Sequence, residues 1–166
     1  MNRLLFFLLS AHLAFCQINP LDIEIVRDKF GVPHIFGKTD AGVAYGLAWA
    51  NAEDDFETIQ SVYLAGSSSL SKRIGNKGIG ADFLSQFIGS SELYDSLYEK
   101  EISPEYKKII EAYAEGLNSY AKKHPEEILV SELFPITPKK MMLYAQLQLF
   151  ISSRGDYWIK KILNDD

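Results

Sequence analysis

Cysteine, histidine and long apolar runs are all scarce in this 166-residue sequence, and each shortage excludes a class of protein. The single cysteine, Cys16, rules out a disulfide framework and a multi-cysteine zinc site within the chain. No apolar run reaches the roughly 18 residues that indicate a membrane span. The net charge of −5 argues against nucleic acid as a partner, because neutralising phosphates requires clustered Lys and Arg.

The three histidines leave little room for a catalytic site that depends on imidazole. His12 lies in the N-terminal apolar segment, so a Ser-His-Asp or Cys-His site would have to use His34 or His124. His34 lies in an expected strand behind Pro33, and His124 ends an expected helix beside Pro125. We interpret both as structural, and no group of His, Cys or acidic residues shows zinc-ligand spacing.

Residues 1–16 have the pattern of a secretory signal peptide. A basic start at Arg3 precedes an apolar run, and the small residues Ala14 and Cys16 precede Gln17. We expect cleavage after Cys16, which gives a periplasmic or secreted mature chain of residues 17–166. A buried N-terminal helix and a lipoprotein anchor on Cys16 are the alternatives.

The remaining sequence predicts a short hairpin followed by helices. Alternation over 22–27 and the run 34–36 indicate two strands, and Thr39 can cap a helix from about Ala41 to Ala65. The first half of this helix is apolar on almost every side, which predicts that several neighbours cover it. Gly66–Gly80 is rich in serine and glycine and predicts a loop.

The second half of the sequence carries three further helix signals. Residues 81–100 predict two helical pieces broken at Gly89. Ser103-Pro104 starts a helix that stops before Pro125, and Thr137-Pro138 starts another that runs through Phe150. The expected fold class is therefore α+β and mostly helical.

Two local motifs suggest chemistry, but each has a simpler interpretation. Glu53, Asp54 and Asp55 could bind metal or work as acid and base, yet successive helix positions point about 100° apart. We expect instead that one of these acids is buried and accepts hydrogen bonds from loop N–H groups. The segment Gly75–Gly80 lacks the Lys-Ser/Thr of a phosphate loop. Composition and spacing alone yield no active site.

One ordered set of motifs resembles the penicillin acylase family of N-terminal nucleophile amidohydrolases. The set spans about Ile23 to Leu149. Its members are Arg27-Asp28, Gly31-Val32-Pro33-His34, Tyr45-Gly46, Ala52-Glu53-Asp54, the loop residues Gly66, Leu70-Ser71, Gly75, Asp82 and Gly89, the helix Ala112–Asn118, and Thr137-Pro138.

The resemblance implies a secreted precursor that cleaves itself into a smaller α chain and a larger β chain with an αββα core. The β chain would begin with the nucleophile, Ser, Cys or Thr, whose own α-amine serves as base. These 166 residues resemble the signal peptide and most of an α chain, so we expect no catalytic residue here and no activity from this chain alone. The implied partners are the β chain and a small acyl-amide substrate, such as a β-lactam side chain or an acyl-homoserine lactone.

The family's α chain contributes to the acyl pocket through the helix after the Thr-Pro start. On this chain the resemblance places Phe150, Arg154 and Tyr157 there as substrate-binding residues. Arg154 could equally be a helix-end cation near free carbonyls. The resemblance implies no cofactor, and Lys160-Lys161 stands where an α-chain acid for calcium would be sought, so no metal is expected.

The sequence departs from the family in two places and leaves one non-enzymatic alternative. Ser67, Ser68, Ser69 and Gln86 stand where many members carry Arg, which leaves the substrate branch open. A secreted helical binding module without catalysis, built on the amphipathic helix Pro104–Lys123, is the second hypothesis.

Overall fold

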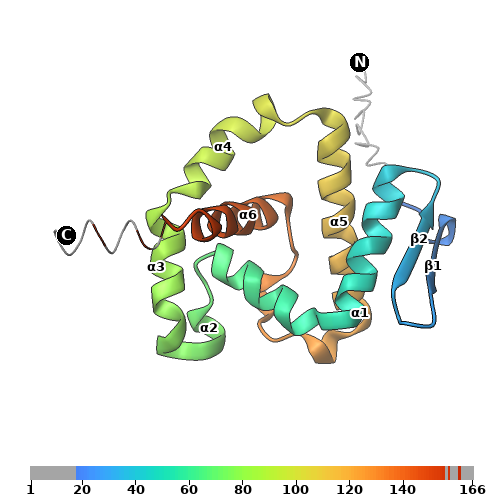
Figure 1. Ribbon diagram of the computed structural model, residues 1–166, viewed down its shortest axis with the longest axis horizontal. Helices are drawn as coiled ribbons and strands as arrows, with labels where there is room; N and C mark the ends of the chain where they lie inside the picture. Colours follow the sequence, from blue (N-terminus) through green and yellow to red (C-terminus); the bar gives the residue numbers. More distant parts are fainter. Residues whose placement is uncertain (1–17, 156, 158–160, 162–166) are drawn as a thin grey trace, which may run out of the picture.

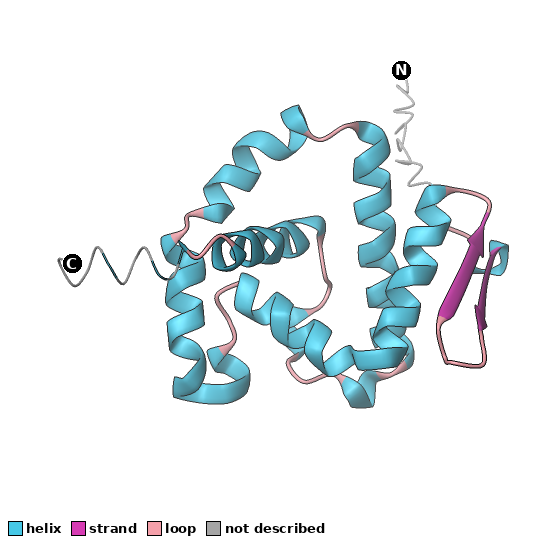
Figure 2. Ribbon diagram, in the orientation of Figure 1, coloured by secondary structure: helices cyan, strands magenta, loops and turns pink. Residues whose placement is uncertain are grey.

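The fold is a small β-hairpin packed on one side of a helical assembly (Figures 1 and 2), as seen in a computed structural model that describes residues 18–155, 157 and 161. The expected signal peptide, residues 1–16, lies outside the described residues. The strands are β1 (Ile23–Arg27) and β2 (Pro33–Gly37). The helices are α1 (Asp40–Gly66), α2 (Ser71–Ile74), α3 (Ile79–Phe87), α4 (Ser90–Glu101), α5 (Pro104–Lys123) and α6 (Pro138–Ser152). Short 3-10 turns cover Pro20–Asp22, Gly75–Gly78, Pro125–Glu127 and Ser131–Leu133.

The hairpin is antiparallel and places its apolar residues on α1. Ile25 pairs with Ile35, and both are half-buried, whereas their strand neighbours face outward. Gly46 of α1 allows this approach, because a Cβ there would lie 2.7 Å from Ile35 and 2.8 Å from Ile23. The predicted hairpin is confirmed.

Helix α1 begins as predicted but contains a kink. Thr39 accepts a hydrogen bond from the N–H of Gly42 through its side chain, which satisfies an otherwise free donor at the helix start. Asp55 has φ −160° and ψ 72°, and its carboxylate accepts from the N–H of Thr58. Asp55 therefore acts as the cap of a second helical segment that follows directly on the first.

The first half of α1 is covered within this chain. The hairpin lies on one side, and α5 lies along another, so close that a Cβ on Gly116 would be 2.5 Å from the carbonyl oxygen of Tyr45. Ala48 and Ala50 are fully buried. The sequence correctly predicted cover on several sides, but that cover does not have to come from a separate chain.

The core lies between α1, α5 and the segment that leads into α6. Phe56, Tyr63, Leu64, Leu117 and Tyr120 are buried there. The Phe56 and Tyr120 rings meet edge to face at 5.0 Å between centroids, a favourable aromatic geometry. Helix α6 contacts α1, α4 and α5, and Figure 1 shows it inside a ring of these helices and α3.

The segment expected as a loop, Gly66–Gly80, is mostly helical and corrects the sequence prediction. Helix α2 and the 3-10 turn Gly75–Gly78 occupy residues 71–78, and α3 starts at Ile79. Gly78 lies against the backbone of Ser71, where a Cβ would be 2.5 Å from the amide nitrogen. Gly78 permits this close backbone approach and Gly75 has φ +61°, so the segment forms a tight helical hook that its serine and glycine content did not predict. The predicted break at Gly89 is confirmed, with φ +67°.

Candidate functional site

Arg27 joins the hairpin to the middle of α1. Its guanidinium donates to the carbonyl oxygen of Gly31 at 2.9 Å, to Glu53 Oε2 at 3.1 Å and to Asp54 Oδ1 at 2.8 Å. The hydrogen bond to Glu53, followed by that to Asp54, raises the pKa of Arg27. Glu53 and Asp54 therefore pair with the Arg27 guanidinium, which joins the hairpin to α1.

The expectation that one of Glu53, Asp54 and Asp55 is buried and accepts loop N–H groups is wrong. All three are exposed: Glu53 and Asp54 pair with Arg27, and Asp55 accepts from the N–H of Thr58. Asp82 has the expected role instead: its carboxylate accepts from the N–H of Leu70 at 2.6 Å and of Ser71 at 3.0 Å. This contact fixes the turn after α1.

Asp28 and Asn118 hold two further loops. Asp28 Oδ1 accepts from the N–H of Phe30 at 2.8 Å and of Val32 at 3.1 Å, and Oδ2 lies 3.5 Å from Nε2 of His34. Asn118 donates to the carbonyl oxygen of Ile136 and accepts from its N–H, at 2.8 and 2.7 Å. The motif residues thus build a scaffold that positions the start of α6.

The three predicted substrate-binding residues meet at the end of α6. Phe150 is half-buried, and its ring occupies the space that a Cβ on Gly155 would need. Arg154 has φ +60°, which ends the helix, and its guanidinium carbon lies 4.8 Å from the centroid of the Tyr157 ring. The Arg154 cation and the Tyr157 ring are therefore presented together and exposed, whereas Phe150 packs against Gly155.

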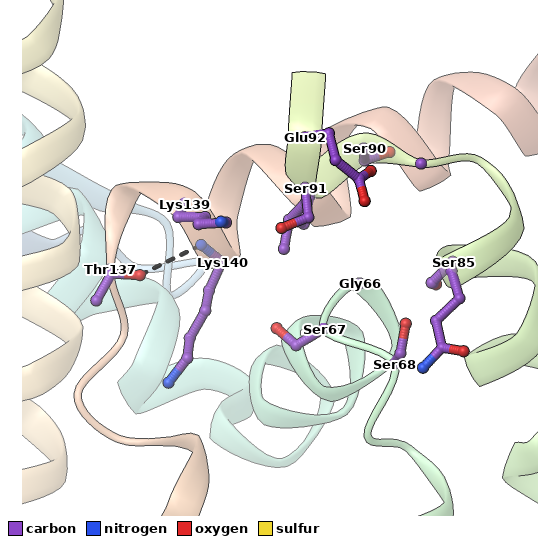
Figure 3. Close-up of a pocket in the computed structure, with 13 residues that line it drawn as sticks. Gly66, Ser67, Ser68, Ser85, Ser90, Ser91, Glu92, Thr137, Lys139 and Lys140 are labelled. Carbon is purple, nitrogen blue, oxygen red and sulfur yellow. Dashed lines mark hydrogen bonds between the residues drawn. The ribbon is translucent and has the colours of Figure 1, made fainter. Parts of the chain in front are cut away.

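A separate cavity of about 490 Å³ lies between the C-terminal end of α1, α3 and the starts of α4 and α6 (Figure 3). Residues with hydroxyl groups form part of its lining, and Lys139 and Lys140 lie on the α6 side. The hydroxyl residues are Ser67, Ser68, Ser85, Ser90, Ser91 and Thr137. Phe150, Arg154 and Tyr157 do not line this cavity. Sequence reasoning did not find the cavity, because its lining residues come from four helices.

Four polar side chains of this cavity make structural contacts, whereas Ser67 Oγ is buried and has no hydrogen-bond partner among the described residues. Ser85 donates to the carbonyl oxygen of Ala65 at 2.6 Å, and Lys139 pairs with Asp95 at 2.7 Å. Lys140 donates to the carbonyl oxygens of Leu133 and Pro135, and burial lowers its pKa. The lining residues include no histidine, and no hydrogen bond links a lining serine to a lysine ammonium within the described part of the chain. The cavity can hold a polar group, but it lacks an activated nucleophile.

Sequence comparison with known protein families identifies the family to which this chain belongs. The family model described as penicillin amidase matches residues 22–158, which include the whole scaffold and the end of α6. The chain belongs to the penicillin amidase family. Penicillin G acylase from Escherichia coli is 24% identical over 150 residues, which cover 86% of this chain and 17% of that protein.

Two other relatives are acyl-homoserine lactone acylases from Pseudomonas fluorescens strain Pf-5. QuiP is 25% identical over 64% of this chain, and PvdQ is 25% identical over 66% of it. These alignments cover 13% and 15% of the relatives. The chain thus spans about a sixth or less of the length of the curated relatives that it matches.

Solved structures support the same fold. A thermostable penicillin G acylase from Alcaligenes faecalis superposes with a TM-score of 0.62 at 19% identity, covering 77% of this chain and 72% of that one. At this identity the likeness shows the fold. Across the described residues, we find no helix with the length and apolar character needed to cross a bilayer.

Proposed function

We propose that this chain is the signal peptide and most of the α chain of a secreted or periplasmic precursor that hydrolyses an acyl-amide bond. The observation that supports the proposal most strongly is the family match over residues 22–158 in a chain that aligns with only 17% of the Escherichia coli penicillin G acylase. The substrate class is a β-lactam side chain, an acyl-homoserine lactone or a similar amide, in keeping with the names of the relatives.

The proposed mechanism places the nucleophile outside this chain, as the first residue of the β chain released by self-cleavage. A free α-amine has a pKa of about 7.7–8.0, so near neutral pH it can accept the proton of its own hydroxyl or thiol. Donors of the β chain would stabilise the oxyanion that forms on attack at the amide carbonyl.

The proposed role of this chain in that reaction is to position the acyl group. Phe150 offers an apolar surface, Tyr157 an aromatic ring, and Arg154 a cation that can hold a carbonyl or carboxylate of the substrate. Arg154 has φ +60° just beyond the end of α6, and its guanidinium carbon lies 4.8 Å from the centroid of the Tyr157 ring.

An exposed apolar stripe on α3 is consistent with a β-chain partner that completes an αββα core. Ile79, Phe83 and Phe87 recur at four-residue steps and are 54–67% exposed, and the two phenyl rings stack at 6.1 Å. Contiguous exposed apolar side chains of this kind mark interaction surfaces. The proposed occupant is the remainder of the precursor.

The pocket role of Arg154 can be tested in the full-length precursor. We expect Arg154→Asn, whose side chain tolerates a positive φ, to change kcat/KM roughly tenfold for some acyl groups and not for others. Steady-state kinetics on a panel of acyl-amides measures this, with intact mass confirming normal processing. Arg154→Lys, which keeps the charge, is the matched variant and should lose less. Equal kinetics for all three proteins across the panel would contradict the pocket role.

A further inference from the structure

We propose that His124, Glu126 and Glu127 form a binding site for a divalent transition-metal ion at the C-terminal end of α5. His124 Nδ1 lies 3.7 Å from Glu126 Oε1 and 3.4 Å from Glu127 Oε1. One ligand atom from each residue falls within 4.8 Å of the others. The cluster is distinct from the end of α6 and from the serine-lined cavity, and neither the family motifs nor the proposed catalytic role uses it. It departs from the expectation that no metal binds, because the turn after α5 brings together three side chains that lack the spacing of a zinc motif.

The distances suit a metal ion placed between the three side chains. Ligand nitrogen and oxygen atoms about 2.0–2.2 Å from a tetrahedral zinc ion lie roughly 3.4 Å apart. The two distances from His124 are 3.4 and 3.7 Å, so the imidazole already has nearly the required separation from both carboxylates. Glu126 is 69% exposed, so its side chain has the freedom to close the remaining separation.

The turn that carries the two glutamates is held from within the core. Gln60 is fully buried, donates to the carbonyl oxygen of Glu127 at 2.9 Å and accepts from the N–H of Leu129 at 2.8 Å. The His124 ring stacks on Tyr120 with centroids 4.3 Å apart. The hydroxyl of Tyr120 also lies 3.3 Å from both carboxylate oxygens of Glu127. Partners of this kind, one step behind the ligands, orient them and strengthen metal binding.

The local charge also favours an added cation. Two carboxylates lie together just beyond the C-terminal end of α5, where the helix dipole is negative. Lys123 places its ammonium over the Trp49 ring, 4.9 Å from the centroid, and therefore has a partner of its own. A bound cation would relieve the repulsion between Glu126 and Glu127.

The donor set indicates the class of ion. One imidazole with two carboxylates suits Zn²⁺, Ni²⁺ or Cu²⁺, whereas Ca²⁺ and Mg²⁺ prefer oxygen ligands alone. Three protein ligands leave a position for water. An ion bound here would link the C-terminal end of α5 to the turn Pro125–Glu127. A hydrogen bond from Gln60 already joins that turn to α1.

Calorimetric titration of the full chain with ZnCl₂ tests the site. We expect one saturable site, at least tenfold weaker in His124→Ala and in Glu126→Gln. The matched control is His34→Ala, which removes the exposed imidazole of the hairpin beside Asp28 and should leave the affinity unchanged. Glu126→Gln is isosteric at an exposed position, so circular dichroism should show a fully folded variant.

A second readout uses Trp49, whose ring centroid lies 6.4 Å from that of His124. Cu²⁺ bound at His124 should quench Trp49 fluorescence, and both His124→Ala and Trp49→Phe should remove the saturable quenching. The proposal is overturned if Zn²⁺ gives no saturable heat, if His34→Ala weakens binding as much as His124→Ala, or if Ca²⁺ binds as tightly as Zn²⁺. The first result would mean that no such site forms, and the other two would assign the binding to another histidine or to scattered surface carboxylates.

Discussion

Gln60 shows how much a single buried polar side chain can organise. It is fully buried on α1 and makes hydrogen bonds to the backbone of Phe56, Glu127 and Leu129. A buried donor or acceptor that loses its partner costs about 1–3 kcal/mol. The side chain therefore fixes the turn after α5 relative to α1 across 67 residues of sequence.

Replacing Gln60 by methionine should destabilise the protein by about 2 kcal/mol, because the volume is kept while the backbone of Glu127 and Leu129 loses its partners. Urea denaturation followed by circular dichroism measures the free energy of unfolding. Gln86→Met, at an exposed position on α3, is the matched control and should change stability by less than about 0.5 kcal/mol. Similar losses in both variants would show that the buried hydrogen bonds of Gln60 contribute nothing.

Asp28 gives the hairpin turn a defined pH dependence. The N–H of Phe30 is the main cause of the lowered pKa of this carboxyl, and the N–H of Val32 and the imidazole of His34 lower it further. A lowered folded-state pKa contributes stability that is present above the unfolded value, about 3.9, and is lost as pH falls through the folded value. The ionised Asp28 carboxylate therefore stabilises the turn at neutral pH, and this stabilisation is lost in acid.

We therefore expect the amide protons of Phe30 and Val32 to lose exchange protection below about pH 4, before the amides in the middle of α5 do. Hydrogen exchange read by NMR at a series of pH values measures this. Asp28→Asn should remove the pH dependence of these two amides. Protection that stays constant down to pH 2 in the unaltered protein would contradict the assignment.

At the scale of elements, the packing of α1 on α5 depends on small residues. A Cβ added at Gly116 would lie 2.5 Å from the carbonyl oxygen of Tyr45 and 2.8 Å from Cβ of Ala48. Backbone cannot move aside as a flexible side chain can. An added methyl group must therefore push the two helices apart along the contact that covers the first half of α1.

Gly116→Ala should cost about 1–3 kcal/mol of stability, in spite of the better helix propensity of alanine. Gly80→Ala is the matched control, because Gly80 lies inside α3 with nothing within 4 Å of its ideal Cβ position. That variant should be stabilised by roughly 0.5–1 kcal/mol. Thermal melts of both proteins compare them directly, and a neutral Gly116→Ala would mean that α1 and α5 are less tightly packed than described.

Elements with a local signal were predictable from the sequence, and contacts between distant residues were not. Thr39, Ser103 and Thr137 each cap a helix where the sequence places one. The kink at Asp55 was hidden by an apolar period that continues across it, and the helical hook of residues 71–78 was hidden by serine and glycine. Likewise, the sequence predicted that an acid at residues 53–55 accepts hydrogen bonds from loop N–H groups. Only the fold shows that Asp82 faces the turn and accepts them.

The same limit applies to the candidate site. The resemblance places Phe150, Arg154 and Tyr157 near one helix end, where the structure pairs Arg154 with Tyr157 and packs Phe150 against Gly155. Their role as substrate-binding residues stays a prediction. The cavity between α1, α3, α4 and α6 has no local signal, because each helix contributes only a few of its lining residues.

At the scale of the whole molecule, the chain combines a core of its own with exposed apolar surface. The described residues bury Phe56, Leu64 and Leu117, whereas Leu47 on α1 is 41% exposed. The apolar stripe of Ile79, Phe83 and Phe87 on α3 remains exposed. Together with the family match, this surface supports an α chain that folds around its own core and docks onto a larger partner.

The central claim is that the nucleophile lies beyond these residues, on a β chain of the same precursor. Expression of the full-length precursor, with intact mass and N-terminal sequencing of its products and an acyl-amide assay, tests it most directly. We expect two chains, the smaller containing the sequence described here and the larger beginning with Ser, Cys or Thr, and activity only when both are present. Acyl-amide turnover by the purified 166-residue chain alone, or an unprocessed protein without acylase activity, would contradict the claim.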